Sequence, residues 1–413
     1  MSCPEPQTTG GPLSGFCILD LTSVVLGPLA TQMLGDMGAD IIKIESLEGD
    51  LIRHNGEIIA PMMGSIHLTL NRNKRSLAVD LKTEAGREVV RRLLPRVDAL
   101  VHNMRTSAIE GLGLGYEAVR VLKPDIVYCV ANGYGLDGPH GHRPAFDDII
   151  QAGCGLALLN GLERPAPDYI PTLLADKTVG MALANAVLAA LLARERTGLG
   201  QWVEVPMLET MAAFTLAEHM GGLTRDPACA PAGYNRLLHG GRLPCPTRDG
   251  FIAMLPYTLE HWLGFLEETG LQARGEALNI RDRASRGANV KQLSALVREV
   301  SPTKTTAEWM EICERLDIPA SPLYSLDELP EHPHLKAVGL FETQQHPHVG
   351  PIRSVRPATR FSATPATARM PAPLLGEHTH EILSSLGYSV AEILALTSDN
   401  VVRVANTAVV PAT

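Results

Sequence analysis

Asp176 is the residue whose type and setting most strongly suggest chemistry. It stands in LLADKTVGMALANAVLAALLARERTGLGQ, residues 173–201, between an apolar lead-in and a long run of small apolar residues. A helix beginning at Lys177 would leave its first backbone N–H groups unpaired, and an Asp just before it is a preferred N-cap. The run 181–193 is apolar on every face except at Asn185, so this helix is expected to be buried. A carboxylate there can cap the helix or do chemistry, and these residues alone leave both open.

A second group of candidates is basic. The stretch NRNKRS contributes Arg72, Lys74 and Arg75, and Lys82 and Arg105 follow later. A solvated surface is the ordinary explanation, but these positions lie near expected strand ends, where open α/β sheets bind ligands. Arg and Lys there suit phosphate groups, although the sequence has no G-x-x-x-x-G-K-[ST] loop. A phosphate-bearing ligand held without such a loop would fit coenzyme A.

A parallel α/β unit is expected to position these residues. From Phe16 onward, β-rich runs alternate with helical patterns: FCILDLT, PLATQMLGDMG, ADIIKIE, SLAVDL, TEAGREVVRRLLPR, DALVHNM, YEAVRVLKP and DIVYCVANGYG. Parallel sheets bind ligands at the carboxyl ends of their strands. The segments at those ends are 22–27, 45–50, Lys82, 103–105 and 132–135. The predicted fold class is therefore α/β, with an open, parallel, Rossmann-like sheet.

Four segments are expected along the chain. These are a flexible lead, 1–14; the first part of a large α/β domain, 15–223; a small α/β domain with linkers, 224–330; and a return to the large domain with a C-terminal tail, 331–413. The second boundary rests on a loop rich in Pro and Gly, 224–248. The strand-like GFIAML and the amphipathic KQLSALVREV and TTAEWMEICERL supply the small domain.

Composition excludes several classes of function. The 413 residues are 45% hydrophobic and 20% charged, as in an ordinary soluble enzyme. The net charge of −9, without long runs of one sign, argues against nucleic-acid and membrane partners. Seven scattered cysteines without zinc-ligand spacing indicate reduced thiols, a cytoplasmic location and no metal site. The run 181–193 is too short to span a bilayer. The GLGLG of 111–115 lacks the strand, helix and acidic partner of a dinucleotide site.

The chain resembles the family III CoA-transferases from about Leu13 to Tyr388. The matching pieces, in order, are ILDLTSVVLGPLATQMLGDMGADIIKIE, NRNKRSLAVDLKTEAGREVVRRLL, DALVHNMR, DIVYCVANGYGLDGP, FDDIIQAGCGL, LLADKTVGMALANAVLAALLARERTGLGQWVEV, DIPASPLYSLDEL and PLLGEHTHEIL. The resemblance implies transfer of CoA from an acyl-CoA to a free carboxylic acid, with CoA as co-substrate and no other cofactor. It also implies an interlaced homodimer.

Roles for individual residues follow from the resemblance. Asp176 matches a catalytic aspartate that attacks the donor thioester, giving a mixed anhydride and then an aspartyl-CoA thioester from which the acceptor acid collects CoA. A helix N-terminus would favour its ionised form. Gly240 and Gly241 in LLHGGRLP match a glycine loop whose N–H groups would approach a developing oxyanion. The CoA-binding candidates are Val25, Leu26, Lys74, Val79, Asp80, Leu81, Lys82, Asn103, Met104, Arg105, Asn132, Gly133 and Tyr134.

Two alternatives stay open. The related 2-methylacyl-CoA racemases carry a His where this chain has Phe146, and proton shuttling at a Cα needs two groups, so a lone Asp176 favours transfer. His140 and His142 in GPHGHRP fit a solvated turn. A CoA-binding protein without turnover is the alternative from another class. The sequence does not name the two acids, although Arg236 and Arg242 suggest a dicarboxylate.

Overall fold

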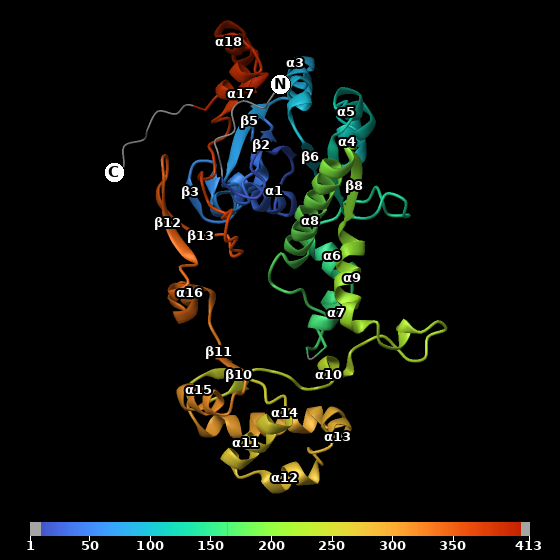
Figure 1. Cartoon of the computed structure of the whole chain (residues 1–413), viewed down its shortest axis with the longest axis vertical. Helices are drawn as coiled ribbons and strands as arrows, with labels where there is room; N and C mark the ends of the chain where they lie inside the picture. Colours follow the sequence, from blue (N-terminus) through green and yellow to red (C-terminus); the bar gives the residue numbers. More distant parts are fainter. Residues whose placement is uncertain (1–9, 163, 406–413) are drawn as a thin grey trace. The chain divides into compact units, whose positions relative to one another are not determined.

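The structure is a computed structural model that describes residues 10–162 and 164–405 (Figure 1). Contacts divide the chain into two compact units: the first runs to Thr215 and resumes at Ala337, and the second is Leu216–Lys336. The expected lead lies mostly outside the described residues. In its described part Leu13 is buried, and its N–H donates to the Met37 carbonyl oxygen at 2.8 Å.

Seven strands form the main sheet of the first unit, in the order β14-β5-β2-β1-β6-β7-β8. Their bounds are β1 Cys17–Leu21, β2 Asp40–Glu45, β5 Lys74–Val79, β6 Ala99–His102, β7 Val127–Asn132, β8 Gln201–Pro206 and β14 Val402–Arg403. Neighbours from β5 to β8 are parallel, and β14 is antiparallel to β5. The predicted α/β fold with a mostly parallel sheet is therefore confirmed.

The strand order reverses beside β1. Strands β2 and β5 lie on one side of β1, and β6, which comes next in the sequence, lies on the other side. In the pairing of β1 with β6, Leu21 is opposite His102. The loops that leave these two strands, 22–25 and 103–105, therefore separate at the same edge of the sheet. Open α/β sheets bind ligands at this kind of switch point.

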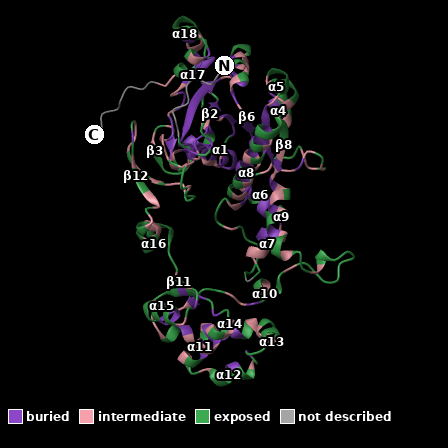
Figure 2. Cartoon of the chain, in the orientation of Figure 1, coloured by how far each residue is buried: buried purple, intermediate pink, exposed green. Residues whose placement is uncertain are grey.

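Each face of the sheet has its own core, because successive strand residues point to opposite faces. Ile18 packs with helices on one face and Leu19 with helices on the other. The first face carries α1 Leu26–Asp36, α6 Asp147–Gly153, α7 Leu156–Asn160, α8 Leu174–Thr197 and α9 Met207–His219; the second carries α3 Glu84–Leu93, α4 Thr106–Gly111, α5 Tyr116–Leu122, α17 Thr379–Ser385 and α18 Val390–Ser398. Figure 2 shows the strands β2 and β6 mostly in the buried colour, between helices with exposed outer sides.

Helix α8 is apolar on most sides but is not buried on all of them. By length and hydropathy it is the one described helix that could cross a membrane. It packs instead against α1, β7 and β8, with Leu183 and Val187 fully buried, so it is a core helix. Met181 and Leu192 are 46% and 53% exposed. The prediction that the whole helix is buried is wrong for this side.

The chain from Ala337 onward completes the first unit. Two strands, β12 Phe341–His346 and β13 Gly350–Val355, form an antiparallel hairpin. The Asn73 N–H then donates to the Met370 carbonyl oxygen at 2.9 Å, which ties this segment to β5. Smaller elements near the sheet are β3 Ile58–Ala60, β4 Met63–Gly64 and α2 Ser65–Leu70.

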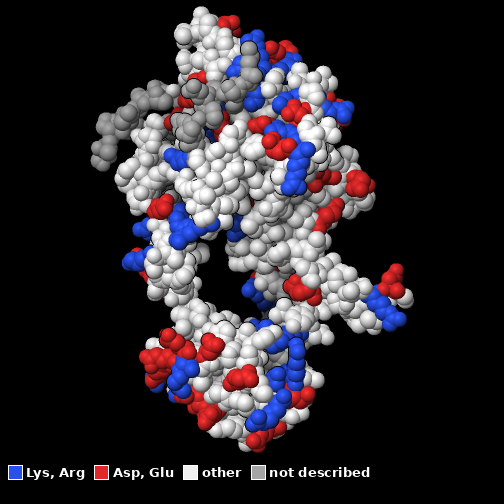
Figure 3. All heavy atoms as spheres, in the orientation of Figure 1, with Lys and Arg blue, Asp and Glu red and all other residues white. Residues whose placement is uncertain are grey.

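The second unit has a three-stranded antiparallel sheet in the order β11-β10-β9. Its elements are β9 Cys245–Pro246, β10 Phe251–Met254, β11 Ala320–Pro322, α10 Asn235–Leu238, α11 Leu259–Thr269, α12 Gln272–Ala277, α13 Arg283–Ala288, α14 Val290–Val300, α15 Thr306–Arg315 and α16 Pro333–Ala337, the last ending at the boundary. Phe265 and Trp309 stack in its core with ring centroids 5.8 Å apart. In Figure 3, Lys and Arg side chains gather beside α13 and α14.

Candidate active site

Half of the predicted site residues surround one cavity at the switch point, with a volume of about 420 Å³. They are Val25, Leu26, Asn103, Met104, Arg105, Asn132, Gly133 and Asp176. These residues come from the loops after β1 and β6, the end of β7 and the first turn of α8. The fold thus brings residues as far apart in the sequence as Val25 and Asp176, 151 positions, to one cavity, as the parallel sheet predicts.

Asp176 lies inside the first turn of α8, which begins at Leu174 and not at Lys177. The capping role is therefore wrong: Leu173 is the N-cap residue, and no side-chain hydrogen bond is made there. Within the described residues, no group donates a hydrogen bond to the Asp176 carboxylate, which is half-buried and lines the cavity. An unpaired carboxylate that faces a cavity is free to act as a nucleophile.

The surroundings of Asp176 make its carboxylate unusually basic. Burial first, and then the charges of Asp147 and Asp148, raise the pKa of Asp176 from 3.8 to about 6. The start of a helix favours the ionised form, but desolvation and two like charges outweigh that effect. Above pH 7 the group is still mostly ionised, so it combines a full negative charge with a high affinity for an electrophilic carbon.

Asp147 fixes the start of α8 from its place on α6. One carboxylate oxygen of Asp147 accepts the N–H of Asp176 at 2.9 Å, and the other accepts Nε2 of Gln151 at 2.6 Å. Gln151 in turn accepts the N–H of Ile170 at 2.9 Å. Asp147 and Gln151 are both buried. The sequence analysis missed this pair, although an acid and an amide four residues apart in FDDIIQ lie on one helix face.

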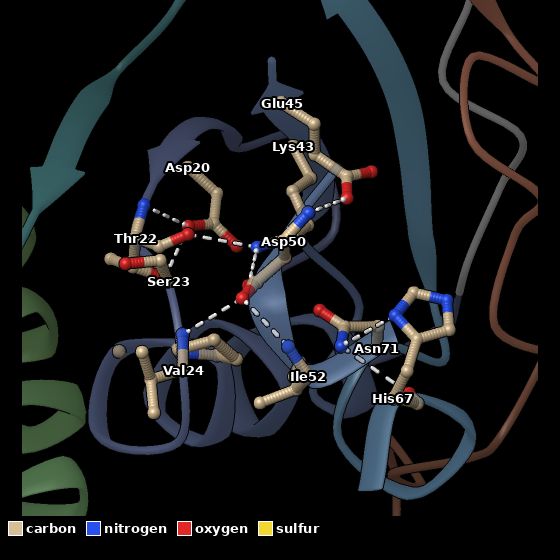
Figure 4. Close-up of polar contacts among 12 residues, drawn as sticks. Asp20, Thr22, Ser23, Val24, Lys43, Glu45, Asp50, Ile52, His67 and Asn71 are labelled. Atoms are coloured by element: carbon tan, nitrogen blue, oxygen red, sulfur yellow. Dashed lines mark hydrogen bonds and ion pairs between the residues drawn. The ribbon is translucent and has the colours of Figure 1, made fainter. Parts of the chain in front are cut away.

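Three side chains hold the loop that leaves β1. Nζ of Lys43 donates to the Thr22 carbonyl oxygen at 2.8 Å. Asn103 accepts the N–H of Ser23 and donates to its carbonyl oxygen, both at 2.9 Å. An oxygen of Asp50 accepts the N–H of Val24 at 3.1 Å, and Figure 4 shows Asp50 between Val24 and Lys43. Asn103 is a predicted CoA-binding residue, but its side-chain oxygen and nitrogen both hydrogen-bond to this loop.

Val24 adopts a backbone conformation that the loop must enforce. Its φ is 68°, in the left-handed region, where β-branched residues are rare. Such strain persists where neighbouring groups over-determine it, and it clusters at functional sites. The enforcing pair is Asp50 and Lys43, 3.1 Å apart and both buried. Burial alone would lower the pKa of Lys43, but Asp20, Asp50 and Glu45 raise it above its ordinary value, so the ammonium stays charged.

A second cavity, of about 410 Å³, adjoins the first. The two share Ser23 and Met104. Predicted CoA-binding residues on the walls of the second cavity are Val79, Asp80, Leu81, Lys82 and Met104. Both cavities therefore border the loop after β1.

Three of the five basic candidates form ion pairs with aspartates of the same chain. Their partners are Asp36 for Arg72, Asp20 for Lys74 and Asp40 for Arg75. The Lys74 ammonium is fully buried and also donates to the Pro28 carbonyl oxygen and to Asn71, both at 2.9 Å. Direct contact between Lys74 and CoA is therefore a wrong expectation. Lys82 and Arg105 are exposed at the two cavities, and neither forms a salt bridge in the described part of the chain.

The remaining candidates lie outside these cavities. The Tyr134 ring contacts His140 edge-on, with centroids 5.7 Å apart. Gly240 and Gly241 belong to the second unit. A Cβ on Gly240 would stand 2.2 Å from the Arg236 carbonyl oxygen, and Gly241 has a φ of 59°, so this turn requires both glycines. Among the described residues, no group of three or more His, Cys, Asp or Glu is placed to hold a metal ion.

Comparisons with known proteins identify the family of the chain. The sequence profile described as CoA-transferase family III matches residues 13–379. Succinyl-CoA:glutarate CoA-transferase of Mus musculus is 32% identical over 382 residues, covering 91% of this chain and 86% of that protein. Formyl-CoA:oxalate CoA-transferase of Escherichia coli is 30% identical over 420 residues, covering 95% and 99%.

A solved structure shows the same fold. The crystal structure of Rv3272 from Mycobacterium tuberculosis matches with a TM-score of 0.77 and 30% identity, covering 90% of this chain and 98% of that one. Rv3272 is described as a probable fatty acyl-CoA transferase. With the family profile spanning most of its length, the chain belongs to CoA-transferase family III and is an acyl-CoA:carboxylate CoA-transferase.

Proposed function

We propose that the enzyme moves CoA through covalent intermediates on Asp176. The carboxylate attacks the thioester carbonyl carbon, CoA leaves as the thiolate, and a mixed anhydride forms. The thiolate attacks the aspartyl carbonyl carbon, which releases the donor acid as a carboxylate and leaves an aspartyl-CoA thioester. The acceptor carboxylate then displaces the thiolate. Attack of the thiolate on the new acyl carbonyl carbon yields acyl-CoA and frees Asp176.

The observation that carries this proposal is the unpaired Asp176 carboxylate on the cavity wall. Because the pKa of Asp176 is raised, its charged form makes the folded protein less stable. A carboxylate with a purely structural role would have no reason to carry that cost. The cavity is also lined by residues at the start of α1, including Val25 and Leu26. A role for the Gly240–Gly241 turn in binding the oxyanion stays a prediction from the family resemblance.

An exchange assay tests the activity directly. The enzyme is given an acyl-CoA and a labelled free acid, and label should appear in the CoA thioester pool. The panel pairs small monocarboxylates with dicarboxylates, because relatives are named for succinyl, glutarate, formyl and oxalate substrates. If CoA binds but no pair exchanges, the protein is a CoA-binding protein without turnover.

A racemase is the second candidate, because His142 lies on the wall of the same cavity as Asp176. The position that carries the racemase His is Phe146, which also lines this cavity and cannot transfer a proton. A racemase must wash deuterium from the solvent into the Cα position of its acyl-CoA. We expect no such exchange here.

Arg105 is proposed to bind a phosphate of CoA. It is exposed at the mouth of the first cavity, next to the start of α4. Arg105→Ala should weaken CoA binding by about 1.5 to 3 kcal/mol, the range for a charged hydrogen bond, and leave the fold intact. Calorimetric titration with CoA and with dephospho-CoA measures this. Arg120→Ala removes an exposed arginine away from both cavities and should bind CoA as the wild type does; equal affinities in both variants would contradict the assignment.

A homodimer is proposed from the family resemblance and from the exposed side of α8. Met181, Asn185, Leu188 and Leu192 form a stripe along that side, at spacings of four and three residues. The exposed side of a mostly apolar helix is normally covered by other protein, and we propose that a second chain covers it here. Sedimentation at micromolar and nanomolar concentrations should show two chains, and Leu192→Glu should shift the protein toward monomer. Val121→Glu, on another exposed surface, should not, and a wild-type monomer that is folded and active would contradict the dimer.

The cytoplasm is the proposed location. Five of the six described cysteines are buried, and none of the six forms a disulfide. This pattern suits a reducing compartment. Coenzyme A enters only as a co-substrate in the proposed reaction.

A further inference from the structure

Asp147 is a buried carboxylate whose charge no cation balances. It lies in the first turn of α6 and is 4% exposed. Its two oxygens accept neutral N–H groups, one from the Asp176 backbone and one from the Gln151 side chain. Over residues 10–162 and 164–405, Asp147 forms no ion pair. A buried charge held in this way is costly, and an apolar or amide side chain would serve the fold at a lower cost.

Gln151 extends this contact to the segment that precedes α8. It is fully buried, one turn after Asp147 on the same helix. Oε1 of Gln151 accepts the N–H of Ile170 at 2.9 Å, and its Nε2 lies 3.3 Å from the Thr172 carbonyl oxygen. One face of α6 therefore holds both the chain that enters α8 and the first turn of α8, which carries Asp176. All of these residues belong to the first unit.

The charge of Asp147 acts on Asp176 at close range. Burial is the largest cause of the raised pKa of Asp176, and the charges of Asp147 and then Asp148 add to it. The other titratable groups on the cavity wall are Arg105, His142 and Arg143. Lys177, the next residue on α8, donates its ammonium to Oγ1 of Thr172 at 2.6 Å. None of these groups forms an ion pair with Asp176 in the part of the chain that the structure describes, so the repulsion is not cancelled.

Both proposed covalent forms of Asp176 lack its negative charge. When the carboxylate oxygen attacks the thioester carbon, the C–S bond breaks and the charge leaves on the CoA sulfur. When the thiolate then attacks the aspartyl carbon, the bond to the acyl group breaks and the charge leaves on the donor acid. Repulsion from Asp147 therefore destabilises the free carboxylate but not the uncharged anhydride and thioester.

We propose that Asp147 is a positioning residue for CoA transfer, which holds Asp176 at the cavity and whose unbalanced charge favours the covalent forms of Asp176 over the free carboxylate. Asp147 contacts the backbone N–H of Asp176 and no reacting atom. This inference rests on the proposed covalent function of Asp176. The equilibrium that it shifts converts free enzyme and acyl-CoA into aspartyl-CoA enzyme and free acid.

The test measures the constant of that equilibrium in the full-length enzyme. Succinyl-CoA and succinate, or the most active pair of the exchange assay, are mixed with enzyme at about pH 8, where Asp176 is ionised in every variant. Mass spectrometry of the intact protein, quenched in acid, gives the fraction that carries CoA.

Two substitutions at Asp147 separate charge from position. Asp147→Asn removes the charge and should lower the equilibrium constant about threefold to tenfold, since one pKa unit corresponds to a factor of ten and burial causes the largest part of the shift. Asp147→Glu keeps the charge but displaces the acceptor oxygen, so it should keep the constant within about twofold and lower kcat about tenfold or more. The affinity for free CoA should stay unchanged in both variants.

Two further variants are controls. Asp148→Asn removes the exposed like charge without touching the buried hydrogen bonds, so it should lower the constant less than Asp147→Asn does. Asp399→Asn removes an exposed charge at the end of α18 and should change nothing. Thermal melting shows whether each variant is folded, because in Asp147→Asn the new amide nitrogen faces Nε2 of Gln151.

The possible results distinguish this inference from the proposed function. An unchanged equilibrium constant in folded Asp147→Asn would overturn the role of the charge, and if that variant does not fold, an unchanged constant in Asp148→Asn would do so. Wild-type kcat in Asp147→Glu would overturn the positioning role. Loss of CoA affinity in proportion to kcat would show that Asp147 only shapes the binding cavity. Wild-type enzyme that exchanges labelled acid but never carries CoA would remove the covalent function itself.

Discussion

Asp176→Asn should lose essentially all CoA transfer, because an amide cannot act as the carboxylate nucleophile. Wild-type enzyme given acyl-CoA and then hydroxylamine or borohydride should be modified on the peptide that contains Asp176, since these reagents attack anhydrides and thioesters. The variant should carry no modification. Mass spectrometry of the digested protein measures both.

The same substitution should stabilise the fold. Asp176 has a folded-state pKa of about 6 against an ordinary value of 3.8, so its charged form costs stability. That cost is absent below pH 3.8, grows as the pH rises toward about 6, and is complete above it. Near pH 7.5 the Asn variant should have a free energy of unfolding higher by about 1 to 3 kcal/mol, and the difference should vanish below about pH 4. Urea unfolding at the two pH values checks this.

Asp148→Asn is the matched control for both measurements. Asp148 is an exposed carboxyl neighbour whose charge helps to raise the pKa of Asp176. Its Asn variant should keep the covalent modification, and the pH at which Asp176 becomes reactive should fall. An active Asp176→Asn enzyme, or a modification that maps to another carboxylate, would show that Asp176 is not the nucleophile.

The parallel sheet could be predicted because its signal is local. Buried strands such as DIIKIE are continuous apolar runs, and their alternation with helical patterns leaves little choice of fold class. The loops at the strand ends followed from the same argument, and 103–105 does line the cavity. The start of α8 was misplaced by three residues, because the expected Asp cap was a stronger sequence signal than the apolar Leu174 that actually begins the helix.

Pairing between distant residues could not be predicted. The stretch NRNKRS looked like a phosphate-binding surface, yet Arg72, Lys74 and Arg75 each meet an Asp that precedes them by more than 30 residues. The Lys74 and Arg75 pairs form because the parallel strands β1, β2 and β5 lie side by side, and Arg72 meets Asp36 at the end of α1. Charge alone does not show whether a lysine will face a ligand or a buried carboxylate.

Asp50→Ala should destabilise the protein by about 3 to 5 kcal/mol, the usual cost of removing one partner of a buried ion pair. Asp50 lies 3.1 Å from the Lys43 ammonium, accepts the N–H of Val24 at 3.1 Å and caps the short helix that begins at Leu51. Without it, Lys43 keeps a buried charge with less compensation, and Val24 loses the bond that fixes its left-handed conformation. Because the loop lines the cavity of Asp176, kcat of the folded fraction should fall as well.

Val24→Gly separates the loop conformation from the ion pair. It leaves Asp50 and Lys43 in place and keeps the backbone N–H that Asp50 accepts. Glycine adopts a φ of 68° without the steric cost of about 1 to 2 kcal/mol that an L-residue carries there, but its freer unfolded chain costs about 0.5 to 1 kcal/mol. The free energy of unfolding should therefore stay within about 1 kcal/mol of wild type, and CoA transfer should persist. Wild-type stability and kcat in Asp50→Ala would instead mean that Asn103 and packing alone set this loop, and that the buried pair has no part in positioning the site.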